Sequence, residues 1–197
     1  MSVDHQRMAE RRRAGYEKKK ARATREKGLL IVNTGPGKGK TTAAMGMVLR
    51  AVGHGMGVGV VQFIKGAMDS AERRVLSQFP AVRFHAIGEG FTWLTQDRER
   101  DMATARRAWE VAREMVLDPG LPLVVLDELN VILKYEYLPL EEVLETLAAR
   151  PEGHHVVVTG RHAPAALVEQ ADLVTEMRAV KHPFKEQGVR AQPGIEF

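Results

Sequence analysis

Cysteine is absent from this chain of 197 residues. Without it there can be no disulfide, no thiolate nucleophile and no cysteine-bound zinc, and we expect a cytoplasmic protein. Long apolar runs are absent too, since no stretch approaches the ~20 apolar residues of a membrane-spanning helix. The N-terminus is charged with no apolar segment behind it, which predicts no secretory signal. We therefore expect no membrane partner.

Apolar residues make up 44% of the chain. This share is enough for a packed core and too high for a disordered protein. The length fits one domain with a short appendage, because domains usually hold roughly 100–200 residues.

Positive charge is concentrated at one end of the chain. The net charge is +4, but residues 1–27 hold ten basic and four acidic residues, and the other 170 residues hold 19 basic and 21 acidic ones. The first part therefore carries +6 and the rest −2. We expect a basic N-terminal arm over 1–27, helical when docked against something, and a single α/β domain over 28–197.

Six short runs rich in apolar and branched residues predict strands. They lie at 29–33, 58–64, 82–87, 123–126, 155–159 and 173–176. Continuous apolar runs are typical of strands buried on both faces of a parallel sheet. Helical patterns lie between them, at 40–52, 97–117, 140–147 and from about 164. In the second of these, one face carries Met102, Ala105, Trp109, Ala112 and Val116. The alternation predicts a doubly wound α/β fold of the P-loop, RecA-like type, with helices on both faces of a mainly parallel sheet.

The strongest signal is the segment TGPGKGKTT at 34–42, which follows the first strand and opens the first helix. Glycines let backbone N–H groups approach phosphate oxygens closely, and a helix N-terminus favours negative charge. Lys40 is expected to reach the terminal phosphates and the Thr41 hydroxyl to bind Mg²⁺. Thr34 stands where the usual pattern has its first glycine, so the loop is a variant. The predicted nucleotide-binding residues are Gly35, Pro36, Gly37, Lys38, Gly39, Lys40, Thr41 and Thr42.

The apolar run at 123–126 ends in two carboxylates, Asp127 and Glu128. At a strand end beside a phosphate loop, an acid can hold Mg²⁺ directly or through water. Together the two motifs predict binding of ATP or GTP with Mg²⁺.

A glycine-flanked segment, GEGFTW at 88–93, carries two large aromatic residues, Phe91 and Trp93. Such a segment does not fit a core strand or helix. Its rings either pack on the domain's own surface or form a lid over a flat, largely apolar ligand.

The ordered series of motifs resembles the P-loop class of ATP:corrinoid adenosyltransferases. The motifs are TGPGKGKTT, RAVGHG (50–55), VGVVQFIKG (58–66), GFTW (90–93), VVLDEL (124–129), YEYLPLEEV (135–143), TGR (159–161) and VKHPF (180–184). The resemblance covers nearly the whole chain from about Gly28 to Phe197. Pro36 replaces the asparagine of the commonest family loop, which leaves Lys40 and Thr41 in place.

The resemblance implies that the Co(I) of a reduced corrinoid attacks the 5′ carbon of ATP and that triphosphate leaves. The corrinoid would be cobinamide, cobyrinic acid a,c-diamide or cobalamin. Electrons would come from a reduced flavoprotein, and the family suggests a homodimer. The implied catalytic residues are Lys40, Phe91 and Trp93, the two rings covering the axial face of the corrinoid. Thr41 and Glu128 would ligate Mg²⁺ or Mn²⁺, with Asp127 supporting them.

Further candidates lie at the ends of other strands. Gln62 and Lys65 follow the second strand at the same edge and are candidates to touch nucleotide or corrinoid. Arg161 follows the fifth strand and either reaches a phosphate or is solvated. Basic residues near the VKHPF motif either meet polar groups of the corrin rim or belong to a solvated tail.

Two other functions remain open from the residues alone. One is a P-loop ATPase or kinase that cleaves the γ-phosphate. The other is a nucleic-acid-binding module that uses the arm, but a body of net charge −2 argues against it, and we expect no nucleic-acid partner. The arm itself is either a helix that folds over the ATP–corrinoid site or a solvated tail.

Overall fold

The computed structural model describes residues 3–64, 70–88 and 97–196. Within these residues, six parallel strands form one sheet in the order β3-β2-β4-β5-β1-β6. The strands are β1 (Leu30–Thr34), β2 (Val58–Gln62), β3 (Val82–Ala86), β4 (Leu123–Asp127), β5 (His155–Thr159) and β6 (Leu173–Glu176). The predicted α/β fold with a parallel sheet is confirmed. Because the strands are parallel, all six carboxyl ends meet at one edge.

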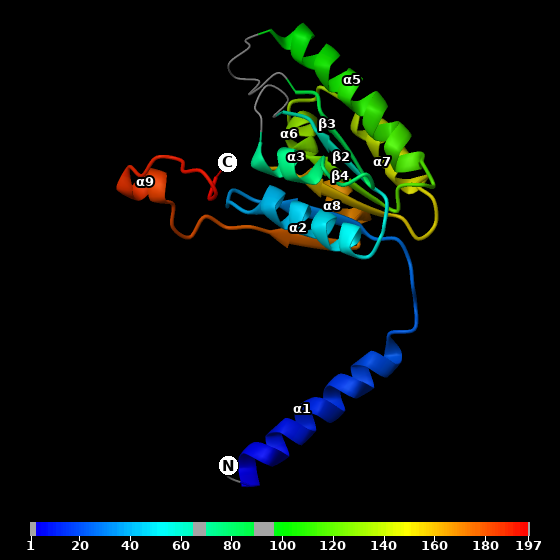
Figure 1. The fold of residues 1–197 in the computed structure, drawn as a ribbon, viewed down its shortest axis with the longest axis vertical. Helices are drawn as coiled ribbons and strands as arrows, with labels where there is room; N and C mark the ends of the chain where they lie inside the picture. The colour runs from blue at the N-terminus through cyan, green and yellow to red at the C-terminus, as the bar shows by residue number, and fades with distance from the viewer. Residues whose placement is uncertain (1–2, 65–69, 89–96, 197) are drawn as a thin grey trace.

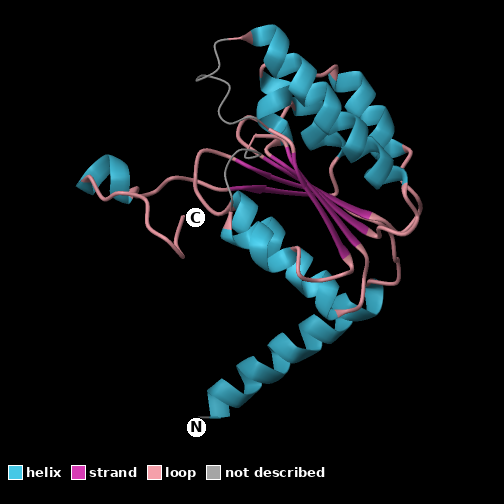
Figure 2. Cartoon of the chain, turned by 45° about the horizontal axis from the view of Figure 1, so that its top comes forward, coloured by secondary structure: helices cyan, strands magenta, loops and turns pink. Residues whose placement is uncertain are grey.

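Helices cover both faces of the sheet (Figures 1 and 2). One face is covered by α2 (Lys40–Gly53) and α3 (Ala71–Leu76). The other face is covered by α5 (Arg98–Leu117), α6 (Leu129–Lys134), α7 (Leu140–Ala148) and α8 (Ala165–Gln170). Each face has its own apolar core, as a doubly wound fold requires. None of the described helices is apolar over a length that could cross a membrane.

The edge strands differ from the prediction that every strand is buried on both faces. All four residues of β6 are exposed, and β3 alternates between exposed and half-buried residues, whereas β2 and β4 are buried throughout. The cause is position, since a strand at the edge of a sheet lacks a neighbour on one side. Met102 was also expected on the buried face of α5, but it is 39% exposed.

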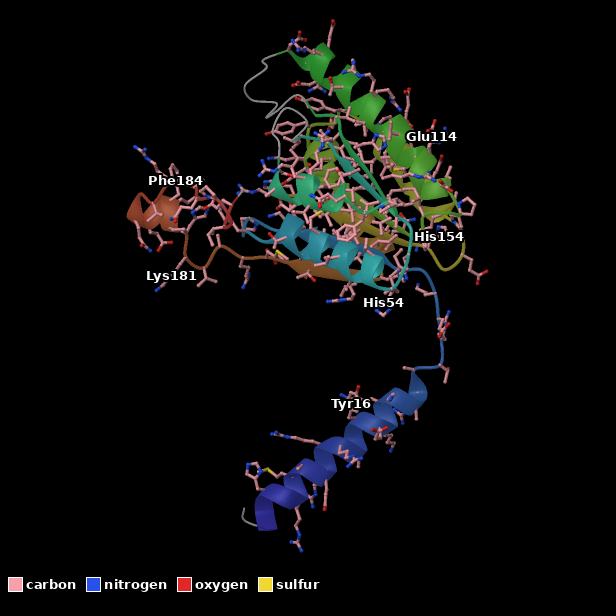
Figure 3. The ribbon with its side chains drawn as sticks, in the orientation of Figure 1. Tyr16, His54, Glu114, His154, Lys181 and Phe184 are labelled. Atoms are coloured by element: carbon pink, nitrogen blue, oxygen red, sulfur yellow. The ribbon has the colours of Figure 1, made fainter. Side chains whose placement is uncertain are left out.

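The basic arm forms α1 (Val3–Arg22), which lies apart from the sheet in Figure 1. Every side chain described in α1 is exposed, including that of Tyr16, which Figure 3 labels on this helix. The linker from α1 enters the sheet at the start of β1, opposite the edge where the strands end. In this arrangement α1 does not cover the phosphate loop of its own chain.

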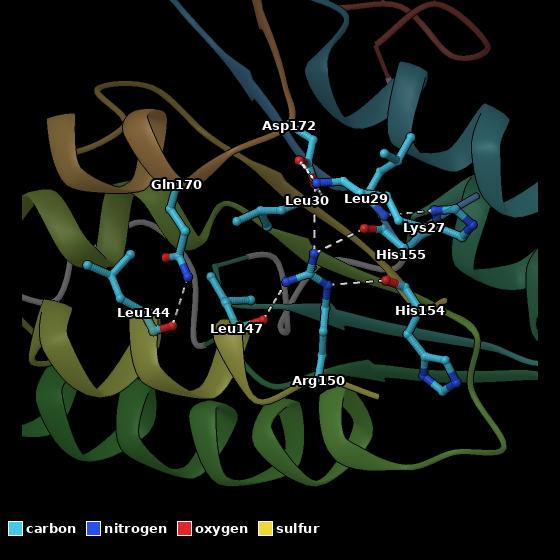
Figure 4. A network of polar contacts seen from close by, with 11 residues as sticks. Lys27, Leu29, Leu30, Leu144, Leu147, Arg150, His154, His155, Gln170 and Asp172 are labelled. Carbon is cyan, nitrogen blue, oxygen red and sulfur yellow. Dashed lines mark hydrogen bonds and ion pairs between the residues drawn. The ribbon is translucent and has the colours of Figure 1, made fainter. Parts of the chain in front are cut away.

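A network of polar side chains anchors the linker where it meets the sheet (Figure 4). Asp172 pairs with Lys27 and accepts a hydrogen bond of 2.9 Å from the backbone N–H of Leu30. Arg150 donates to the carbonyl oxygen of Gly28 at 3.2 Å. The Lys27 ammonium, followed by the Leu30 N–H, lowers the pKa of the Asp172 carboxyl. The start of β1 is thereby fixed to the segments that precede β5 and β6.

His155 contributes a bond to this network that depends on its protonation. The N–H of Leu29 donates to His155 Nδ1 at 3.2 Å, which requires that Nδ1 carries no proton. Burial lowers the pKa of the His155 imidazole, and the nearby charges of Arg150 and His154 lower it further. The folded chain therefore favours neutral His155.

We predict that His155 makes the fold less stable in mild acid. Its pKa is lower in the folded chain than the usual 6.5, so its contribution is fully present above about pH 6.5 and falls as the pH decreases through the folded pKa. His155→Asn keeps an acceptor near Nδ1 but cannot gain a proton. Urea unfolding measures the free energy of unfolding between pH 5 and pH 8. This free energy should fall less towards low pH in the variant than in wild type, by about 1.4 kcal/mol for each unit by which folding lowers the pKa of His155. His54→Asn, at an exposed position, is the control and should follow wild type.

Candidate functional site

The phosphate loop lies between the end of β1 and the start of α2. Gly35 and Gly39 have φ angles of 95° and 102°, a region that favours glycine. Gly39 precedes the helix, and its carbonyl oxygen accepts the first helical bond, from Ala43 at 2.8 Å. The N–H groups of the first helical turn therefore have no acceptor inside the helix and are available to an anion. Pro36, Lys38 and Thr42 are exposed around this loop.

Lys40 folds back into its own loop. Its Nζ donates to the carbonyl oxygens of Gly35 at 2.9 Å and Gly37 at 2.6 Å, and the residue is only 7% exposed. Burial lowers the pKa of the Lys40 ammonium, the Glu128 carboxylate opposes this shift, and the Arg161 guanidinium adds to it. Glu128 and Arg161 are therefore close enough to Lys40 to shift its pKa.

Asp127 is the centre of a buried hydrogen-bond network at the end of β4. Its Oδ1 accepts from the hydroxyls of Thr41 at 2.8 Å and Thr159 at 2.7 Å, and its Oδ2 accepts from Gln62 Nε2 at 2.9 Å. The Asp127 side chain is completely buried. It joins α2, β2 and β5 at the base of the phosphate loop.

Four buried polar side chains form a row across the carboxyl ends of four adjacent strands: Gln62, Asp127, Thr159 and Asn33. Side chains alternate along a strand, so these four share the face that α2 covers. In the described chain, Gln62 Oε1 and Asn33 Nδ2 have no hydrogen-bond partner. Gln62, expected to touch ligand, thus lies against Asp127. The sequence interpretation missed Thr159 and Asn33, although each is a polar residue that ends an apolar run at this edge.

Glu128 follows Asp127 in a left-handed conformation, with φ 66° and ψ 18°. Its Oε2 lies beside Gly160, at 3.2 Å from the point where a Cβ of that residue would be. Arg161, the next residue, is exposed at the same edge. The structure therefore brings the predicted residues Lys40, Thr41, Asp127 and Glu128 together, with Arg161 near them.

The segment that follows β6 holds the loop from outside, which the sequence did not indicate. Gly37 N–H donates to the carbonyl oxygen of Met177 at 2.6 Å, and Met177 N–H donates to that of Thr34 at 2.8 Å. Lys38 pairs with Glu196. Farther along, Lys181 and Phe184 lie on an exposed stretch that includes α9 (Pro183–Gln187), apart from the sheet (Figure 3).

The two predicted aromatic residues, Phe91 and Trp93, lie outside the described residues, as does Lys65. The residues just before them are placed at the site. Ile87 N–H donates to the carbonyl oxygen of Gln62 at 3.1 Å, and Gly88 packs on the backbone of Ile64. The segment that carries both rings therefore starts at the edge where Gln62 meets Asp127.

The donor set fits Mg²⁺ or Mn²⁺ bound together with a nucleotide. Thr41, Asp127 and Glu128 offer hard oxygen atoms, and the Thr41 proton points to Asp127, which leaves lone pairs of the hydroxyl for a cation. Across 3–64, 70–88 and 97–196, no group of three or more acidic or histidine side chains could hold a metal alone. In proteins Mg²⁺ is commonly bound by one or two protein groups together with phosphates and water.

The family model described as ATP:corrinoid adenosyltransferase BtuR/CobO/CobP matches residues 26–197. The chain belongs to this family. A corrinoid adenosyltransferase of Pseudomonas aeruginosa is 54% identical over 98% of this chain and 95% of its own length. Corrinoid adenosyltransferases of Sinorhizobium sp. and Salmonella typhimurium are each 50% identical, over 95% and 90% of this chain and 88% and 89% of their own lengths. The predicted family and enzyme class are confirmed.

Among solved structures, domain III of the Thermotoga maritima replication initiation protein DnaA is 13% identical to the adenosyltransferase chain, with a TM-score of 0.39. It covers 75% of this chain and 53% of the DnaA chain. This likeness is too weak to bear on the function of the adenosyltransferase.

We predict that Gly37→Ala weakens ATP binding to the adenosyltransferase. A Cβ at this position would lie 2.6 Å from the carbonyl oxygen of Met177 and 2.7 Å from the backbone of Arg178. Relieving such overlap costs about 1–3 kcal/mol, so we expect about a tenfold or greater loss of affinity in titrations with a fluorescent ATP analogue. Gly46→Ala is the matched control, because its Cβ would meet nothing within 4 Å. Equal affinities for the two variants would contradict a role of the Met177 segment in shaping the loop.

Proposed function

We propose that this enzyme transfers the 5′-deoxyadenosyl group of ATP to the Co(I) of a reduced corrinoid. A Co–C bond forms, the bond between the 5′ carbon and its phosphate oxygen breaks, and triphosphate leaves with the electron pair. The observation that carries the proposal is the convergence of Lys40, Thr41, Asp127 and Glu128 on one phosphate loop in a member of this family.

The protein's part in this reaction is positioning and charge neutralisation. The nucleophile and the leaving group both belong to the substrates, so no side chain has to attack or to move a proton. Lys40 is held at the loop by two carbonyl oxygens and can exchange those weak partners for phosphate oxygens. The N–H groups at the start of α2 add donors on the same side. Lys40 and these N–H groups together stabilise the negative charge that develops on triphosphate as it leaves.

Thr41 and Glu128 are the residues proposed to hold Mg²⁺ or Mn²⁺. The bound cation would neutralise negative charge on the triphosphate. Asp127 is completely buried and accepts a hydrogen bond from the Thr41 hydroxyl, so it fixes the orientation of that hydroxyl. Arg161 lies within electrostatic range of Lys40 and is proposed to contact a phosphate. Gln62 is proposed to act through Asp127, to which it donates.

Phe91 and Trp93 are proposed to cover the axial face of the corrinoid. Support comes from the sequence and from the flank of their segment, which begins at Gly88 beside the site. An axial water or base donates electrons to cobalt and makes the reduction of Co(II) to Co(I) harder. Apolar rings pressed on that face would displace this ligand and exclude water. The electron donor is proposed to be a reduced flavoprotein and the enzyme a homodimer of the cytoplasm.

The corrinoid is proposed to be cobinamide, cobyrinic acid a,c-diamide or cobalamin. All three present cobalt in the same macrocycle, and they differ in the groups at its rim and axial side. The residues that converge at the phosphate loop act on ATP and give no preference among them.

Product analysis tests the reaction. With ATP, Mg²⁺ and a chemically reduced corrinoid, we expect equal amounts of a light-sensitive Co–C product and of triphosphate. Ion-exchange chromatography of the nucleotide products and the visible spectrum of the corrinoid measure the two. A P-loop ATPase or kinase would instead give ADP, with phosphate or a phosphorylated product, and that result would rule out the proposal.

The role of the aromatic rings gives a second prediction. Trp93→Ala should lose most of its activity when the reaction starts from a Co(II) corrinoid with a reductant, because the axial ligand is no longer displaced. It should lose far less when the corrinoid is supplied as Co(I). Rates of Co–C bond formation from both starting states measure the difference. Equal losses in both assays would discredit the rings as a cover for the axial face.

A further inference from the structure

The carboxyl end of β5 contacts both acids of the site, Asp127 and Glu128. Thr159 and Gly160 lie there, between the end of β4 and the phosphate-loop strand β1. We propose that Thr159 is a positioning residue: its single hydroxyl fixes Asp127 and the backbone of Glu128, and so aims the Glu128 carboxylate at the cation that accompanies ATP. The inference rests on the proposed function of Glu128 as a metal ligand.

The backbone of Glu128 needs such support. Its φ of 66° and ψ of 18° lie in the left-handed region, which costs a residue with a side chain about 1–2 kcal/mol. Glycine would take this conformation without cost, but glycine has no carboxylate. Strain of this kind persists only where neighbouring groups enforce it, and it gathers at functional sites.

Thr159 supplies the enforcing bond. The N–H of Glu128 donates to Thr159 Oγ1 at 2.9 Å, and Oγ1 in turn donates to Asp127 Oδ1 at 2.7 Å. A hydroxyl has one proton and two lone pairs, so it can do both at once. Thr159 and Asp127 are completely buried, and water cannot replace the bond without opening the fold.

Gly160 provides room for the Glu128 side chain. A Cβ at Gly160 would lie 3.2 Å from Glu128 Oε2 and 2.9 Å from Asn130 Cβ, and its φ of 128° also favours glycine. Asn130 Nδ2 donates to the carbonyl oxygen of Gly160 at 3.0 Å, which holds α6 against the same strand end. The end of β5 thus sets both the backbone and the side-chain path of Glu128.

The result is a carboxylate held towards the phosphate loop. Glu128 Oε2 lies beside Gly160, at the end of β5, and β5 is paired with β1, the strand that leads into the phosphate loop. Residues that orient a metal ligand from behind typically change metal affinity or activity 10- to 100-fold when they are lost. Thr159 meets the geometric conditions for such a residue.

The test measures Mn²⁺ binding to the protein–ATP complex by electron paramagnetic resonance, without corrinoid. Thr159→Val, which removes the hydroxyl and keeps the shape, should weaken Mn²⁺ binding by about tenfold or more. Thr159→Ser, which keeps the hydroxyl, should restore most of the affinity. The amide of Glu128 should exchange its hydrogen faster in Thr159→Val than in wild type.

Thr146→Val is the matched control. Thr146 is also buried, and its hydroxyl donates to a backbone oxygen, that of Glu142, at 2.9 Å on α7. It should lose some thermal stability and keep Mn²⁺ affinity. If Thr159→Val does not fold, the smaller Thr159→Ala takes its place with the same expectation.

Three results would overturn the inference: unchanged Mn²⁺ affinity in Thr159→Val, equal weakening in Thr159→Val and Thr159→Ser, or equal weakening in Thr146→Val. Failure of the proposed function looks different. Wild-type protein would then bind Mn²⁺ with ATP and yet release no triphosphate in the presence of reduced corrinoid. Because the metal titration contains no corrinoid, the two failures are distinguishable.

Discussion

The rest of the site depends on the hydrogen bonds that the completely buried carboxylate of Asp127 accepts. Removing a charged carboxylate from water costs several kcal/mol, and only close donors offset that cost. Asp127 obtains them from Thr41, Gln62 and Thr159, which belong to α2, β2 and β5. Three elements from distant parts of the sequence are therefore held at fixed positions around one anion, and the phosphate loop is built on this base.

The two neighbouring acids have different tasks because they differ in depth. Asp127 accepts hydrogen bonds from three protein donors and acts as a fixed support. Glu128 is half-buried, turns out of the strand through its left-handed backbone, and opposes the lowering of the Lys40 pKa by burial. Two chemically similar residues thus differ in their surroundings through a single change in backbone direction: Asp127 is buried in the fold, and Glu128, the proposed metal ligand, turns out of the strand.

The sequence predicted those features that depend on local patterns. The apolar runs located the strands, and the glycine-rich motif located the loop between β1 and α2 that carries Lys40 and Thr41, because both signals lie within a few adjacent residues. The short helices α3, α6 and α9 span only five or six residues, too few for a helical period to be recognised. Thr159 was missed because its role comes from partners 31 and 32 residues away. Only the strand order makes those contacts visible.

The order in which the chain is synthesised adds a consequence of the topology. The strand that leads into the phosphate loop, β1, is the first to leave the ribosome, but its two neighbours in the sheet are β5 and β6, the last two. The backbone of Met177 then holds Gly37 and Thr34 from outside. A nascent chain therefore carries the entire TGPGKGKTT motif long before the two strands that flank β1 are present. The contacts that hold the loop from outside can form only late, after β6 and Met177 have been made.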